Sequence, residues 1–117
     1  METVTVTTKE DLEKAVEKGY SEIIVKGDLA EKVRNGVKLK TLSKATIAII
    51  AGAIAAIPFT GGISTVAAAS IAAMSGVEIA LIVAIIFLGI GLIEKLLEQY
   101  DEILVSKDEV VLRKKGN

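Results

Sequence analysis

A block of 49 residues, from Ala45 to Ile93, contains a single charged side chain, Glu78. The chain on either side is highly charged: residues 1–44 hold nine basic and eight acidic residues, and residues 94–117 hold five basic and six acidic ones. A helix at the surface of a soluble domain normally keeps one polar face. The block offers almost no polar face, so it must be covered either by lipid or by protein.

The sequence lacks residue types that several classes of function require. The 117 residues include no Cys and no His, which excludes disulfides and thiolate or imidazole zinc sites and removes the usual general base. Gly89-x-Gly91 follows no predicted strand and has no third Gly, so it is not a dinucleotide-binding fingerprint. The net charge of −1 favours no nucleic acid. We therefore expect a non-enzymatic protein with no catalytic residues, cofactor, metal, nucleic-acid partner or evident small-molecule substrate.

The N-terminal segment has the pattern of a strand, a helix and a strand. The β-branched run at 3–8 predicts the first strand, and SEIIVKG at 21–27 predicts the second. Between them, a capping box at Thr7-x-x-Glu10 predicts the start of a helix, and Gly19 predicts its end. So short a unit favours right-handed, parallel pairing of the two strands.

The C-terminal segment supplies a hairpin, with DEILVS at 101–106 and EVVLRK at 109–114 joined by a Lys-Asp turn. A further short helix is expected from about Asp28, ending or interrupted at Gly36. Neither end of the chain is large enough to be stable alone. We therefore predict an α+β fold in which the N-terminal βαβ unit and the C-terminal β-hairpin form one small sheet, with a central apolar helical hairpin between them.

The apolar block is long enough for two membrane spans, because one span needs about 20 residues. We expect spanning helices from about Leu39 to Ile57 and from Val77 to about Leu97, with a shorter Ala-rich helix between them. The first span would end at the PFTGG turn, and Lys95 could extend its ammonium to the membrane surface. The predicted parts are a βαβ part of a soluble cap (1–38), an apolar region expected to be transmembrane (39–98) and a hairpin that completes the cap (99–117).

Small residues recur every fourth position in two of the predicted helices. The first set is Ala48, Gly52 and Ala56, and the second is Ser64, Ala68, Ala72 and Gly76. Small residues at this spacing let helix backbones approach closely, which is how helices associate in lipid. The two sets therefore predict helix-packing contacts, either within one subunit or at an oligomer interface.

Two groups of charges border the block. Glu78 either closes a Ser75-x-x-Glu78 capping box at a membrane surface or lines the axis of an oligomeric pore. The basic residues that precede the block predict contact with the membrane surface, with a solvated helix face as the alternative. They are Lys32, Arg34, Lys38, Lys40 and Lys44.

The pattern favours a small integral membrane protein that self-associates into a homo-oligomer, and a pore or membrane-permeabilising assembly is the most concrete activity it suggests. The expected partners are the lipid bilayer and further copies of the chain. The basic flank predicts a bacterial inner membrane with both termini cytoplasmic. The alternative is a soluble ring, shell or filament that buries its apolar helices between subunits.

Overall fold

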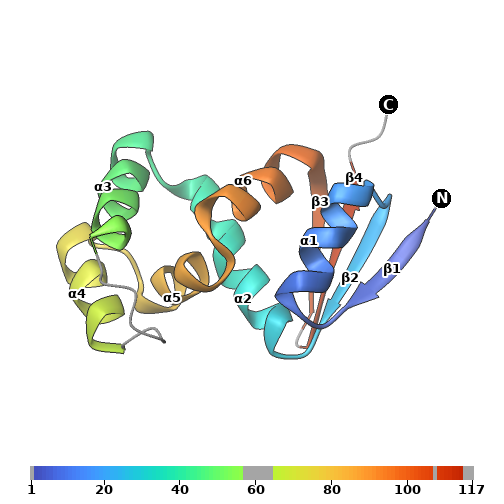
Figure 1. Ribbon diagram of the computed structural model, residues 1–117, viewed down its shortest axis with the longest axis horizontal. Coiled ribbons are helices and arrows are strands. Elements are labelled where there is room, and N and C mark those ends of the chain that lie inside the picture. The colour runs from blue at the N-terminus through green and yellow to red at the C-terminus, as the bar shows by residue number, and fades with distance from the viewer. Residues whose placement is uncertain (1, 57–64, 107, 115–117) are drawn as a thin grey trace.

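The computed structural model describes residues 2–56, 65–106 and 108–114 (Figure 1). In chain order the elements are β1 (Thr3–Val6), α1 (Lys9–Lys18), β2 (Glu22–Lys26), α2 (Asp28–Gly36), the 3₁₀ helix η1 (Val37–Thr41), α3 (Lys44–Ala55), α4 (Thr65–Ser75), α5 (Ile79–Leu88), α6 (Ile90–Gln99), β3 (Tyr100–Val105) and β4 (Glu109–Lys114). The sheet lies at one end of the long axis, and α3 and α4 lie at the other (Figure 1). The predicted α+β class is confirmed.

Both ends of the chain contribute to one four-stranded sheet of order β1-β2-β4-β3. β1 pairs with β2 in parallel, as predicted, and β4 pairs antiparallel with β2 and with β3. One face is buried because alternate residues point into the core: Val25 lies opposite Val110 in register, and both are almost fully buried. The sheet therefore ties the N- and C-terminal segments together, as the sequence predicts.

The helix of the βαβ unit shows why its local sequence folds as it does. The Thr8 hydroxyl accepts a hydrogen bond from the Asp11 amide at 3.2 Å, and Gly19, with φ of 73°, closes the C-terminal end. The predicted Thr7-x-x-Glu10 capping box is therefore wrong by one residue, because the neighbouring threonines carry the same hydroxyl and the helix begins at Lys9. Gly19 as the end of the helix is confirmed.

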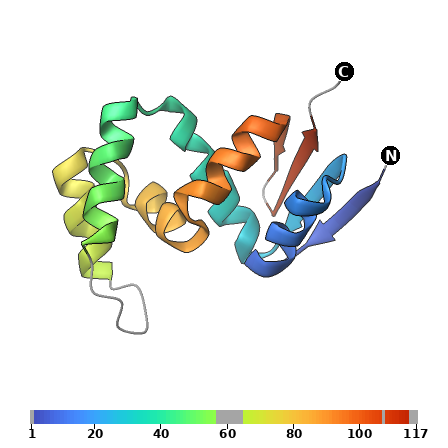
Figure 2. The same cartoon turned by 45° about the horizontal axis from the view of Figure 1, so that its top comes forward.

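α5 lies at the centre of the helical part and packs against α2, α4 and α6 (Figures 1 and 2). Its buried side chains are Leu81, Ile82, Ala84, Ile85 and Leu88. Gly36, at the end of α2, makes this packing possible. A Cβ atom at Gly36 would lie 3.2 Å from the Cδ1 atoms of both Leu88 and Ile93, so the backbone of α2 approaches the α5–α6 junction closely.

Both predicted continuous helices are shorter in the structure. The predicted helix from Val77 to Leu97 is broken at Gly89, where α5 and α6 meet at 92°. The predicted helix from about Leu39 begins only at Lys44, because the Ser43 hydroxyl accepts from the Thr46 amide at 3.1 Å and caps α3. The predicted PFTGG turn lies outside the described residues.

These breaks change the lengths of the apolar helices. In the described part of the chain, no single helix is both long and apolar enough to cross a bilayer. α5 and α6 together have the length and composition of a span, but they form a bent pair.

Tyr100 joins the helical part to the sheet, and its removal tests this junction. Its buried hydroxyl donates a hydrogen bond to the carbonyl oxygen of Tyr20 at 2.8 Å. Tyr100→Phe leaves that carbonyl without its partner, so we expect a loss of about 1 kcal/mol in the free energy of unfolding. Urea titration measures this, with Tyr20→Phe as the matched control. An equal loss in both variants would contradict the assignment.

The same tyrosine makes stability depend on alkaline pH. Burial raises the pKa of Tyr100 above its ordinary value of 10.0. The folded state therefore holds this proton more tightly than the unfolded state does. The contribution to stability is complete below pH 10 and is lost as pH rises through the higher pKa of the folded state. In Tyr100→Phe, this loss of unfolding free energy at alkaline pH should be absent. Urea titrations repeated at several pH values above 10 measure it.

Candidate functional site

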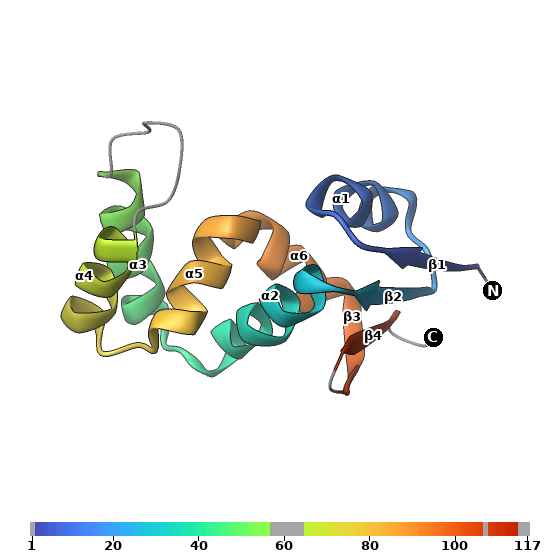
Figure 3. The ribbon, with the colours of Figure 1, turned by 90° about the horizontal axis from the view of Figure 1, so that it is seen from below.

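The distal helices, α3 and α4, form the end of the molecule farthest from the sheet (Figures 1 and 3). No charged residue occurs between Lys44, at the start of α3, and Glu78, just before α5. α3 has 12 residues, so it is about 18 Å long. The molecule therefore presents an uncharged helical end opposite a charged sheet.

The distal helices are apolar on their outer side as well as on their inner side. Ile50 on α3 and Ala68 on α4 are fully buried, which identifies the side that packs on the protein. On the solvent side, Ile49 is 51% exposed and Met74 is 62% exposed. Large apolar side chains at this exposure, on helices whose one charge is Lys44 at the start of α3, are typical of a surface that contacts lipid or another protein.

The structure separates the two predicted sets of small residues. Ala68 and Ala72 are buried within the chain, so in the second set the packing contact is intramolecular. Gly76, at the end of that set, is exposed. The first set lies on the outer side: Ala48, Gly52 and Ala56 are all exposed. Ser64 lies outside the described residues.

The predicted basic residues lie along the chain that leads to α3. Lys32 and Arg34 are half-buried on α2, whereas Lys38 and Lys40 on η1 and Lys44 on α3 are exposed. Lys38 forms an ion pair with Glu78 at 3.7 Å. Lys40 and Lys44 form none with any described residue, and their ammonium groups remain available to an outside anion.

Glu78 does not belong to the predicted capping box. The Ser75 hydroxyl instead donates to the Ile71 carbonyl oxygen at 2.7 Å, inside α4, and so it is not free to cap α5. Glu78 itself occupies the position before α5, but its side chain accepts no amide hydrogen bond there. It is exposed and pairs with Lys38, and an exposed pair contributes little to stability. Glu78 therefore links η1 to the start of α5 at the surface.

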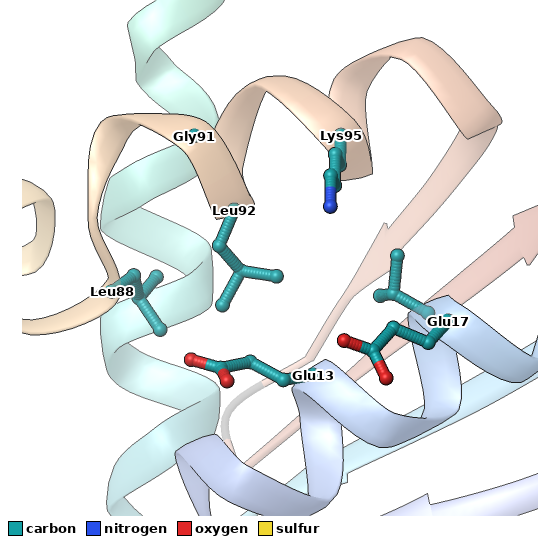
Figure 4. A pocket seen from close by; sticks show the side chains of 7 residues that line it. Glu13, Glu17, Leu88, Gly91, Leu92 and Lys95 are labelled. Carbon is teal, nitrogen blue, oxygen red and sulfur yellow. The ribbon is translucent and has the colours of Figure 1, made fainter.

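A pocket between α1 and α6 is a further feature that the sequence did not predict (Figure 4). It has a volume of about 280 Å³; Glu13 and Glu17 line it from α1, and Leu88, Leu92 and Lys95 line it from the opposite side. The Lys95 side chain points into the pocket (Figure 4). Lys95 lies 78 or more residues from Glu13 and Glu17 in sequence, so no local motif could indicate that these charges meet.

The chemistry of this pocket is limited. Among the described residues there is no group of three or more His, Cys, Asp or Glu placed to hold a metal ion. Glu13 already pairs with Lys9 at 3.7 Å. The pocket places carboxylates of α1 opposite the ammonium of Lys95 on α6, with leucine side chains between them.

The comparisons with known proteins identify a family but no activity. The family described as "Uncharacterised protein PM1101" matches residues 5–115. No curated protein matches the chain. No solved structure matches it either.

Proposed function

The chain belongs to the family of uncharacterised protein PM1101, and we propose that it is a non-enzymatic protein that attaches to a lipid bilayer through its distal helices and self-associates there. One observation carries the proposal: Ile49 and Met74 are exposed on two helices whose one charge is Lys44 at the start of α3, at the end of the molecule opposite the sheet. In lipid these side chains leave water, whereas the charged sheet stays in it.

The dimensions of the distal helices indicate how they would meet the bilayer. The hydrocarbon core is about 30 Å thick. At about 18 Å, α3 is too short to cross it. We propose that α3 lies instead in the membrane interface, with its exposed apolar side among the acyl chains. The distal helices would therefore enter one leaflet, with the rest of the chain on the side of entry.

The exposed lysines favour an anionic leaflet. Lys40 and Lys44 lie just before and at the start of α3, and they form no ion pair with a described residue. A basic side chain near an anionic membrane surface contributes about 1 kcal/mol to binding. Since the cytoplasmic leaflet carries the anionic lipids, we propose that the chain binds the inner membrane from the cytoplasm, with both termini on that side.

Self-association would use the outer side of α3. Ala48, Gly52 and Ala56 are exposed and spaced four residues apart, and a side chain added at Gly52 would meet nothing within 4 Å. A second helix could therefore approach this side closely. We propose that copies of the chain pack here into a homo-oligomer that permeabilises the bilayer.

A second candidate function is a soluble ring, shell or filament that covers the distal helices with other subunits. The burial of one side of α5 favours it, because the most apolar of the described helices is already partly covered by protein. The outer side of the distal helices and the exposed residues of α5 would then need a partner, and further copies of the chain could supply one.

Vesicle flotation combined with dye release tests both candidates. The full chain is mixed with dye-loaded vesicles of phosphatidylethanolamine and phosphatidylglycerol, and the vesicles are floated through a density gradient. Our proposal predicts that the protein floats and that dye is released. Protein that stays at the bottom as a large particle, without dye release, would support the soluble assembly and contradict attachment.

Neutralising two lysines tests the proposed orientation. Lys40→Gln with Lys44→Gln should weaken binding to phosphatidylglycerol vesicles by about 30-fold, since each lysine contributes about 1 kcal/mol. The matched control is Lys14→Gln with Lys18→Gln, which removes the same charge from exposed positions on α1. Equal weakening by both pairs, measured by co-sedimentation, would show that net charge rather than this surface directs binding.

A further inference from the structure

We infer that the break at Gly89 can open, so that α5 and α6 join into one straight helix that crosses the bilayer. The inference rests on the proposed function, because the change is favourable only where lipid replaces water. It supplies one span, which α3 and α4 are too short to provide as they are folded in water. It also assigns a function to the bent pair at the centre of the molecule.

The backbone at the break is already helical on both sides. The Gly89 amide donates to the Ile85 carbonyl at 2.8 Å, and the Ile93 amide donates to the Gly89 carbonyl at 3.2 Å. Both bonds connect residues four apart, as in a continuous α-helix. Gly89 itself departs from the helix, with φ of 89° and ψ of 140°. Rotation of the backbone about this one residue would therefore join the two helices while keeping both bonds.

Straightening at Gly89 would also give hydrogen-bond partners to the first backbone amides of α6. The first amides of a helix have no partner within it, and Gly89, the residue that precedes α6, has no side chain to cap them. In a continuous helix the amides of Ile90, Gly91 and Leu92 would bond to carbonyls of α5. Within lipid such bonds are required, since no water is present to replace them.

The joined helix has the dimensions and charge distribution of a span. Residues 79–99 number 21, which gives a straight helix of about 31 Å against a hydrocarbon core of about 30 Å. The first 15 of them carry no charge, and Glu94, Lys95 and Glu98 lie in the last turns. Lys95 could extend its ammonium to the surface from there.

The protein holds the bent form in water by burial. Leu81, Ile82 and Ile85 on α5 lie in the core, and leaving it would expose them to water. In a bilayer the same side chains would meet acyl chains, so this cost falls away. The core therefore favours the bent form in water and allows the straight form in lipid.

The sheet determines the number of crossings. β2 pairs with β4, so the segments before and after the apolar block stay on one side of the membrane. The chain between them must cross an even number of times. The return crossing would have to come from residues 45–77, which are 33 residues without a charge. Because α3 is only about 18 Å long as folded in water, this segment would have to form a longer helix in lipid.

Protease protection tests the inference. Wild-type protein bound to vesicles of phosphatidylethanolamine and phosphatidylglycerol is digested from outside with proteinase K, and protected fragments are identified by mass spectrometry. A straight helix predicts a fragment that continues from the distal helices through residues 79–93. Protection that ends before Ile79 would overturn the inference and leave membrane attachment intact. Protein that does not bind the vesicles would overturn both.

Two glycine variants make the test specific. Gly89→Ala places a side chain at a backbone conformation that essentially only Gly adopts, so the fraction of bound protein that yields the long fragment should rise about tenfold. Gly91→Ala is the matched control, because Gly91 lies within α6, has no positive φ, and a Cβ there would meet nothing within 4 Å. An equal rise in both variants would contradict the role of Gly89.

Gly36→Val should also favour the straight form, through a residue of α2 that lies against the break. It keeps the test informative if Gly89→Ala fails to fold. The added side chain would press on Leu88 and Ile93, which lie on either side of the break. It leaves the sequence of α5 and α6 unchanged. The long fragment should again increase, and no increase in either variant would overturn the inference.

Discussion

Replacing Ile49 on α3 and Met74 on α4 by Glu is expected to weaken binding to anionic vesicles about a thousandfold. Both side chains are more than half exposed in water, so the new carboxylates stay hydrated and the fold is retained. In the membrane each carboxylate must be moved toward hydrocarbon, at a cost of about 2–3 kcal/mol. Co-sedimentation with phosphatidylglycerol vesicles measures the loss.

The sheet offers a matched control for this pair. Leu104 and Val105 on β3 are 45% and 50% exposed, close to the exposure of Ile49, and they lie in the sheet at the opposite end of the molecule. Leu104→Glu with Val105→Glu introduces the same charge, yet binding should change less than threefold. If this control weakened binding as much as the first pair, the distal helices would not be the surface that meets lipid.

Ile82→Ala is expected to lower the free energy of unfolding by about 3 kcal/mol in buffer without detergent. Ile82 is fully buried in α5, and its removal leaves a cavity beside the core. Ile79→Ala makes the same substitution in the same helix at a position that is 48% exposed. It should cost less than about 1 kcal/mol, because little buried surface is lost. Urea unfolding followed by circular dichroism compares the two.

The difference between these two variants separates two roles for α5. A helix that packs on the protein core in water loses stability only at its buried positions. A helix that meets lipid on every side would show no such difference. Equal and small effects at positions 79 and 82 would therefore contradict the central place of α5 in the fold.

Short sequence patterns predicted the strands and α1, because each of these patterns depends on only a few neighbouring residues. The β-branched run at 3–6, the buried alternation of β2 and the stop at Gly19 all depend on neighbours along the chain. The prediction that both ends of the chain share one sheet followed from size, since neither end could fold alone; that β4 pairs with β2 comes from the structure. Even here the cap moved from Thr7 to Thr8, because the two hydroxyls are equivalent in sequence.

The break at Gly89 could not be predicted in the same way. A single Gly is tolerated within a helix, so FLGIGLI has the local pattern of a continuous one. The bend is fixed by tertiary packing: Gly36 of α2 lies against Leu88 and Ile93 on the two sides of Gly89. That contact joins segments more than 50 residues apart, and no local pattern encodes it.

The sequence predicted which small residues of α3 share one side of the helix, but not whether that side would be buried or exposed. The spacing of Ala48, Gly52 and Ala56 correctly places them on one side of a helix, but the sequence does not say which neighbour that side meets. The structure leaves this side exposed, whereas the side of α4 with Ala68 and Ala72 is covered. Burial depends on the arrangement of helices, which periodicity alone does not determine.

Membrane fractionation with an alkaline wash of the pellet, followed by sizing in detergent, tests attachment most directly. We expect the full chain to stay in the washed pellet and to run in detergent as an oligomer. Release into the supernatant as a large particle would contradict membrane attachment and support the soluble assembly. Release as a monomer would contradict both proposed functions.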